Sequence, residues 1–135
     1  MRGEFPLAQE MAETFLREAE AGGRATEAVT ARRLLAQVLF CQGDLGAARS
    51  FFERALADFV PERDGDARRF DGQASATATL ASVVWHLGEV ERARLLIQEA
   101  IRRARELGHP PTLVNVLLFN AYLARIMRRG LAGVA

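Results

Sequence analysis

Two stretches of sequence decide the fold of this chain: GDLGAARSFFERA at residues 43–55 and GEVERARLLIQEA at residues 88–100. Each opens with glycine and an acidic residue, and each places apolar or small residues five, nine and twelve positions after the glycine. Residues at that spacing share one face of a helix. A glycine at such a place is typical of a tight turn between two helices. We therefore expect a helix to begin after each of these glycines.

The residues ahead of the two glycines repeat as well. At matching distances the chain has Leu35, Ala36 and Leu39 before Gly43, and Leu80, Ala81 and Val84 before Gly88. Each unit is thus predicted to be helix, glycine turn, helix. The alanines seven before and five after each glycine, Ala36, Ala81, Ala48 and Ala93, would let paired helices approach closely.

The glycines recur at a period typical of stacked repeats. Gly3 opens a looser copy of the pattern ahead of Gly43, and Gly130 is a possible fourth copy after Gly88, with intervals of similar length between successive glycines. Periods of about 20 to 50 residues are typical of solenoids, whose units bury their apolar faces by stacking. The pattern therefore favours a binding scaffold.

The pattern resembles the tetratricopeptide repeat (TPR), a helix-turn-helix unit of about 34 residues, over nearly the whole chain. The resemblance implies an all-α superhelix that binds proteins or peptides, with the first helix of each pair lining a concave groove. Arg32 and Thr77 stand where this family usually has a large aromatic residue. Residues 63–73 further resemble the inter-repeat segment of C-terminal TPR regions in bacterial signalling proteins that carry a nucleotide cyclase domain and an ATPase domain. That second resemblance implies a part or derivative of such a protein.

We expect one TPR-like domain of about six helices over residues 1–135. The helices are expected at 6–21, 25–42, 45–59, 74–87, 89–107 and 112–129. The domain then divides into a half repeat (1–23), a repeat (24–61), a loop (62–73), a second repeat (74–108) and a half repeat (109–135).

The composition limits both the cellular compartment and the kinds of catalytic chemistry that the chain could perform. No apolar run approaches the 18 residues of a membrane span, and no basic segment followed by an apolar one opens the chain, so we expect a soluble cytoplasmic protein. The single cysteine, Cys41, excludes an intramolecular disulfide framework. All 18 basic residues are arginine, which excludes a P-loop lysine or a Schiff-base lysine.

The TPR resemblance points to candidate partner-binding residues at matching offsets from the glycines. These are Arg33, Gln37, Phe40, Ser82, Trp85, His86, Asn120 and Arg128. A face of polar, aromatic and cationic side chains suits an extended peptide, and Phe40 and Trp85 are equally well explained as core residues. Arg33 and Gln37 resemble part of the carboxylate clamp of chaperone-binding family members, although Thr79 stands where that clamp has an asparagine.

The two half repeats lead us to expect self-association. The last helix would expose apolar residues that stacked repeats normally cover, namely Leu113, Val116, Leu117 and Leu123. We expect a homodimer that pairs like ends, because a two-fold pairing closes the assembly.

Three other classes of function are weighed against peptide binding. Cys41 and His86 occupy equivalent places and could share a metal or small ligand, but no third Cys or His lies nearby in sequence, and we expect no metal and no cofactor. Arginines late in the last two helices could form a nucleic-acid-binding face. The net charge of only +1, and the spacing of Glu99 and Arg102 that is typical of an ion pair within a helix, argue against this function. No nucleophile-base pair or paired carboxylates can be recognised, so we expect no enzymatic activity.

Overall fold

A computed structural model gives the backbone of residues 4–60 and 72–134, with side chains described for residues 5–60 and 72–125. Those ranges form six helices and contain no strand: α1 (Glu4–Ala21), α2 (Ala25–Gln42), α3 (Leu45–Ala57), α5 (Gly72–His86), α6 (Val90–Leu107) and α7 (Pro110–Val134). The all-α fold class is confirmed over the described residues. Gly3 and residues 62–71 of the expected loop lie outside them.

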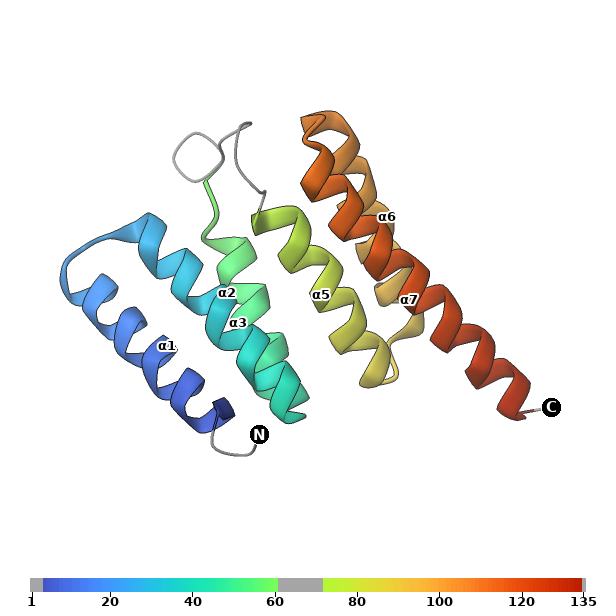
Figure 1. Cartoon of the computed structure of the whole chain (residues 1–135), viewed down its shortest axis with the longest axis horizontal. Helices are drawn as coiled ribbons and strands as arrows, with labels where there is room; N and C mark the ends of the chain where they lie inside the picture. The colour runs from blue at the N-terminus through green and yellow to red at the C-terminus, as the bar shows by residue number, and fades with distance from the viewer. Residues whose placement is uncertain (1–3, 61–71, 135) are drawn as a thin grey trace.

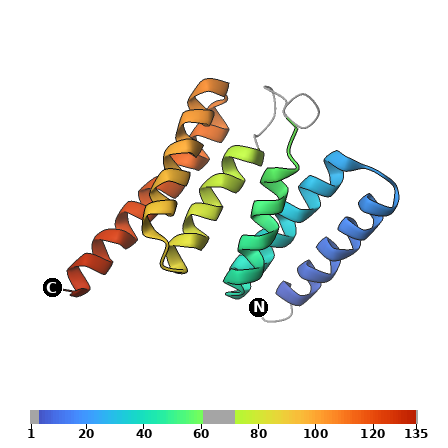
Figure 2. The same ribbon diagram turned by 180° about the vertical axis from the view of Figure 1, so that it is seen from behind.

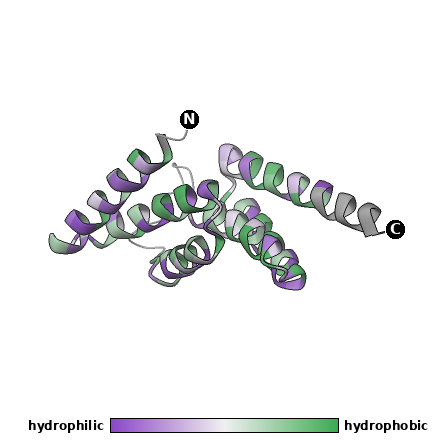
Figure 3. Ribbon diagram, turned by 90° about the horizontal axis from the view of Figure 1, so that it is seen from below, coloured by the Kyte–Doolittle hydropathy of each residue, from purple (hydrophilic) through white to green (hydrophobic). Residues whose placement is uncertain are grey.

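Helices that follow one another in the chain pack side by side in a row that is two layers deep, with α3 behind α2 and α6 behind α7 in Figure 1, and in front of them in Figure 2. α2 pairs with α3 and α5 pairs with α6, while α1 packs on α2 and α7 packs on both α5 and α6. α3 joins the two pairs by packing on α5. Seen from below, the row bends into an arch with α1 and α7 at its two ends (Figure 3).

The two glycine turns have the same geometry. Gly43 (φ 86°) and Gly88 (φ 93°) both adopt the left-handed conformation that L side chains rarely enter. The next residue closes each turn, because the Asp44 amide donates to Leu39 O (2.9 Å) and the Glu89 amide to Val84 O (2.9 Å). The turn motif noticed in the sequence therefore produces two helical hairpins of one design.

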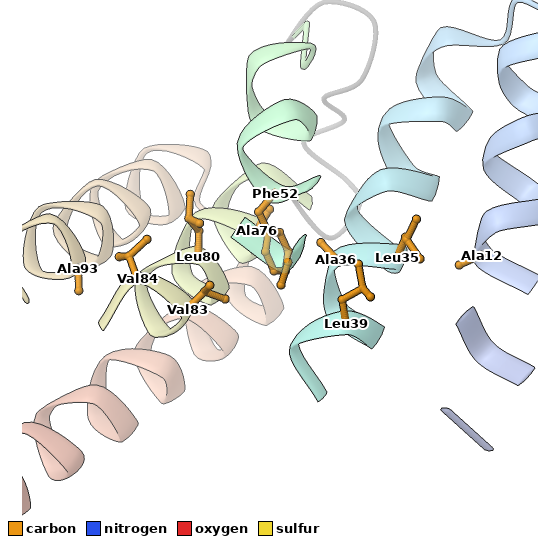
Figure 4. Packing of buried hydrophobic residues seen from close by; sticks show 11 residues of the cluster. Ala12, Leu35, Ala36, Leu39, Phe52, Ala76, Leu80, Val83, Val84 and Ala93 are labelled. Atoms are coloured by element: carbon orange, nitrogen blue, oxygen red, sulfur yellow. The ribbon is translucent and has the colours of Figure 1, made fainter. Parts of the chain in front are cut away.

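Small residues occupy the tightest places between the helices. Ala36, Ala48, Ala81 and Ala93 have no exposed surface. Figure 4 shows Ala36 and Ala93 among the larger side chains of one cluster, which come from three helices: Leu35 and Leu39 of α2, Phe52 of α3, and Leu80 and Val84 of α5. Close approach of the backbones at alanine, with leucine and phenylalanine filling the space beside it, is the packing expected from the sequence.

α5 is the central helix of the row. Every side chain from Ala74 to Val84 is buried, so this helix is covered on all sides. Its alanine, serine and threonine residues allow that coverage, since small side chains let several helices approach together.

Arg32 shows how one expected aromatic position is filled. Its side chain is buried, and its guanidinium donates to Asp58 Oδ2 (2.9 Å) and to Glu20 Oε1 (3.4 Å). The ion pairs of Arg32 therefore connect α2 to α1 and to the end of α3. An aromatic ring at this position could connect these helices only by packing.

Most helix ends fall close to the predicted ones, and two differ in ways that matter. α3 ends at Ala57 instead of residue 59, with Asp58 as its cap. α7 begins at Pro110, where proline is tolerated because the first helical amides need no partner, and continues to Val134. Gly130 therefore lies within a helix, so the interpretation of Gly130 as a fourth turn is wrong.

Candidate functional site

A pocket of about 300 Å³ lies where α2, α5 and α7 come together. Its lining comes from four helices: Arg33 and Gln37 of α2, Phe52 of α3, Ser75, Ala76 and Thr79 of α5, and Asn115 and Phe119 of α7. Among the described residues, no acidic side chain lines it. The pocket is therefore rich in hydrogen-bond donors at its rim and apolar on its phenylalanine side.

Arg33 is the charged group of this pocket. Burial lowers the pKa of its guanidinium, because a less polar environment disfavours the charged form. Within the described parts of the chain no carboxylate pairs with it, and its Nε atom would lie 3.1 Å from a Cβ built on Gly72 at the start of α5. The absence of a side chain at Gly72 thus leaves room for the guanidinium. A partly desolvated cation without a counter-charge is costly, and an incoming anion would compensate it.

Two amide side chains flank Arg33. Ser75 Oγ donates to Asn115 Oδ1 (3.0 Å), which fixes the Asn115 amide and leaves its NH2 group as a donor. Among the described residues, the side chain of Gln37 makes one long contact, from Nε2 to Cys41 Sγ (3.8 Å), so its Oε1 can accept from a ligand N–H. The rim therefore offers donors and an acceptor beside a cation, which suits a carboxylate attached to a peptide.

An aromatic group continues the same helix faces toward the glycine turns. The rings of Phe40 and Trp85 both meet His86 edge to face, with centroids 6.1 Å and 5.0 Å away. His86 Nδ1 donates to the Ser82 carbonyl (2.7 Å), which leaves Nε2 as an acceptor in the neutral ring. Phe40 and Trp85 are half-buried against the core, so each is partly a packing residue and partly a surface.

The structure brings together five of the eight groove residues expected from the sequence. Arg33 and Gln37 line the pocket, and Phe40, Trp85 and His86 form the aromatic group. Ser82 is fully buried in α5, and its hydroxyl makes no hydrogen bond with the described residues, so it offers no surface to a partner.

On α7 the expected residues do not line the pocket. Asn115 and Phe119 take the place foreseen for Asn120, because Gly130, from which that position was counted, is not a turn. The side chain of Arg128 lies outside the described residues. Ser75 and its hydrogen-bond partner Asn115 are 40 residues apart, so an interval of 40 residues from α5 would have identified Asn115 as the residue of α7 that lines the pocket.

The residues expected to mediate self-association are placed differently from the prediction. Val116 and Leu123 are buried against the chain's own helices α5 and α6, and Leu113 is packed beside them. Of the four, only Leu117 has substantial exposure. The interpretation of Val116 and Leu123 as interface residues needs correction, since the side of α7 that carries them faces inward.

A larger cavity, of about 630 Å³, lies between α1, α2 and the end of α3. Its charged groups already have partners. Arg32 pairs with Asp58 and Glu20, and Arg54 also pairs with Asp58, while Arg24 pairs with the nearby Glu27 at 2.6 Å. This cavity therefore lacks the uncompensated charge that sets the pocket of Arg33 apart.

The arginines late in α6 are largely engaged within the chain. Arg102 donates to Glu99 and to Glu106 (2.6 Å), and the hydrogen bond with Arg102 lowers the pKa of Glu99. Arg103 lies over the Phe59 ring, 5.2 Å from its centroid. These contacts reduce the positive charge that this part of α6 could offer to a phosphate backbone.

The described residues hold neither a cluster of metal ligands nor a membrane span. No group of three or more His, Cys, Asp or Glu side chains is placed there to hold a metal ion. None of the helices in that part of the chain combines the length and apolar character needed to cross a bilayer. Comparisons with protein-family models, curated proteins and solved structures find no match to this chain.

Proposed function

We propose that this chain is a non-catalytic, TPR-like scaffold that binds a protein or peptide segment along α2, α5 and α7. A carboxylate of the partner enters the pocket and pairs with Arg33. The observation that carries the proposal is the guanidinium of Arg33, which is partly desolvated and has no counter-charge within the described residues. A site that leaves a cation in this state is preorganised for an anion, because the cost of desolvating the arginine has already been met in folding.

The size and lining of the pocket favour a peptide carboxylate over other anions. About 300 Å³ is at the lower end of ligand sites and suits one residue of a peptide better than a nucleotide. A single guanidinium matches the single charge of a carboxylate, whereas a phosphate would bring a larger charge. Phe119, which is partly exposed, would contact the aliphatic part of the bound residue, and the aromatic group of Phe40, Trp85 and His86 would hold the next residues of the segment.

The repeated hairpins support the TPR-like assignment. α2–α3 and α5–α6 share one turn geometry, and they stack so that the first helix of each pair contributes to the same face. We further propose a cytoplasmic setting and an origin in a bacterial signalling protein, as the resemblance of residues 63–73 to cyclase and ATPase proteins implies.

A peptide display library tests the proposal, with randomised peptides presented at a free C-terminus and, in a second pool, at an internal position. We expect wild type to enrich sequences ending in a free carboxylate or carrying Asp or Glu at one fixed position. Arg33→Ala should lose them, while Arg33→Lys should keep a weakened preference.

Arg94→Ala is the matched control, because Arg94 is an exposed arginine of α6 outside the pocket. Enrichment that is identical for wild type and Arg33→Ala would remove the pocket from the proposal. Capture of DNA by wild type, with steep salt dependence, would instead support the arginine-face alternative.

A further inference from the structure

We propose that the outer face of α7 docks on α1 of a second copy of this chain, so that copies associate end to end. On α7, Val114, Leu118 and Tyr122 are 57%, 64% and 44% exposed, and together with Leu117 they form an apolar strip on the side away from α5 and α6. We call this strip the α7 outer face. Large exposed side chains gathered on one helix face are typical of an interaction surface.

The same face of α5 is covered within the chain. Ser75 of α5 and its hydrogen-bond partner Asn115 of α7 are 40 residues apart. The same interval relates the buried residues Ala76 and Val83 of α5 to the buried residues Val116 and Leu123 of α7. The same interval matches two alanines of α5 with residues of the α7 outer face, Ala74 with Val114 and Ala78 with Leu118, and it matches Ala81 with Ala121, an exposed residue next to that face. Those alanines are buried in one cluster with Ile97, Ala100 and Ala104 of α6. The α7 outer face is therefore the place at which a helix equivalent to α6 would pack.

α1 presents a face of the right spacing. Leu7 and Met11 are 57% and 65% exposed, and a groove of about 310 Å³ runs along them between Glu10 and Glu18. Leu7, Met11, Thr14 and Glu18 repeat the intervals of Ala93, Ile97, Ala100 and Ala104, the residues that α6 turns to the core. The adjoining side of α1, which carries Ala12 and Ala19, is buried. The groove can thus receive Leu118 while α1 remains packed on α2.

The distribution of charge favours α1, and not a second α7, as the helix that docks on the α7 outer face. Glu10 and Glu18 border the α1 groove, whereas α7 contains no acidic residue and carries exposed Arg125 on the C-terminal side of Leu118. Pairing α7 with α7 would bring arginine toward arginine, and pairing α1 with α1 would bring glutamate toward glutamate. An antiparallel pairing of α7 with α1, like that of α5 with α6, brings Arg125 to the level of Leu7, one helical turn from Glu10.

The interface differs in kind from the closed dimer expected from the sequence. It joins two different surfaces, so each dimer keeps one free α1 and one free α7 outer face. Such an interface builds a ring or an open chain instead of stopping at two copies.

Sedimentation velocity tests the proposal with two blocking variants, Met11→Asp and Leu118→Asp. Wild type should show a mass that rises from the 14.9 kDa monomer through dimer to larger species between micromolar and millimolar concentration. Each variant alone should remain a monomer, because every copy lacks one of the two surfaces. An equimolar mixture should form a dimer and nothing larger, since one intact α1 groove meets one intact α7 outer face.

Controls separate this result from misfolding and from the proposed function. Both changed residues are exposed, so thermal melts of the variants should match wild type, and Leu95→Asp, on an exposed position of α6, should assemble as wild type does. Arg33→Ala should assemble normally, because the inference does not depend on the pocket. Three outcomes would overturn it: a monomeric wild type, assembly by either blocking variant alone, or a mixture that stays monomeric.

Discussion

Replacement of Arg33 by methionine should make the isolated protein more stable and should abolish its binding of a partner carboxylate. The guanidinium is partly buried without a counter-charge in the described residues, and methionine keeps most of the apolar stem while removing the charge. Leaving a buried polar group without a partner costs about 1 to 3 kcal/mol, and we halve this because Arg33 is only partly buried. The expected gain in the free energy of unfolding is therefore about 0.5 to 1.5 kcal/mol.

That gain corresponds to a measurable change in Tm. An unfolding entropy of about 2.1 cal/mol/K per residue gives about 0.28 kcal/mol/K for 135 residues, so Tm should rise by about 2 to 5 °C. Circular dichroism melts of wild type and Arg33→Met measure the shift. Arg94→Met, which removes an exposed arginine, should change Tm by less than about 2 °C. A lower Tm for Arg33→Met would show that the guanidinium stabilises the fold, and the reasoning about an unsatisfied charge would fail.

Three further changes test the packing and the site. Ala48→Leu should lower the free energy of unfolding by about 1 to 3 kcal/mol through overpacking, and Ala57→Leu at the exposed end of the same helix should be nearly neutral in the same urea titration. Gly88→Ala should cost about 1 to 2 kcal/mol because alanine is strained at φ 93°, and an unchanged urea midpoint would contradict the turn geometry. Gly72→Ala should weaken the binding of carboxylate peptides in a fluorescence titration, because the added Cβ would lie 3.1 Å from Arg33 Nε and force the guanidinium to shift. An unchanged affinity would argue against this position of the guanidinium.

The hairpins could be predicted from the sequence because their signals are local. Gly43 and Gly88 are each flanked by the same kinds of residue at the same offsets, and a glycine in the left-handed conformation ends a helix through its own backbone. The alanines beside these turns could be placed in the interface for the same reason. Arg33 and Gln37 of the site followed from their distance to Gly43.

The arrangement of α7 could not be predicted in the same way. This helix is apolar on both sides, with Val116 and Leu123 inside and Val114 and Leu118 outside, so its pattern alone does not tell which side packs on α5. Gly130 added to the difficulty, because a glycine within a helix costs only about 1 kcal/mol and need not end it.

Ser82 shows a second limit of the pattern. It has the same offset from its glycine as Gln37, yet it is buried, because α5 is covered on all sides while α2 lies nearer the end of the row. Its burial depends on helices from elsewhere in the chain, which a local offset does not record.

A titration followed by NMR tests the central claim most directly, with N-acetylalanine as a probe that carries one C-terminal carboxylate and its amide as the matched control. The acid should shift the Arg33 Nε–Hε signal and the side-chain amide signals of Asn115 and Gln37, whereas the amide probe should leave them in place. Equal shifts from both probes, or shifts from the acid confined to arginines outside the pocket, would contradict the claim.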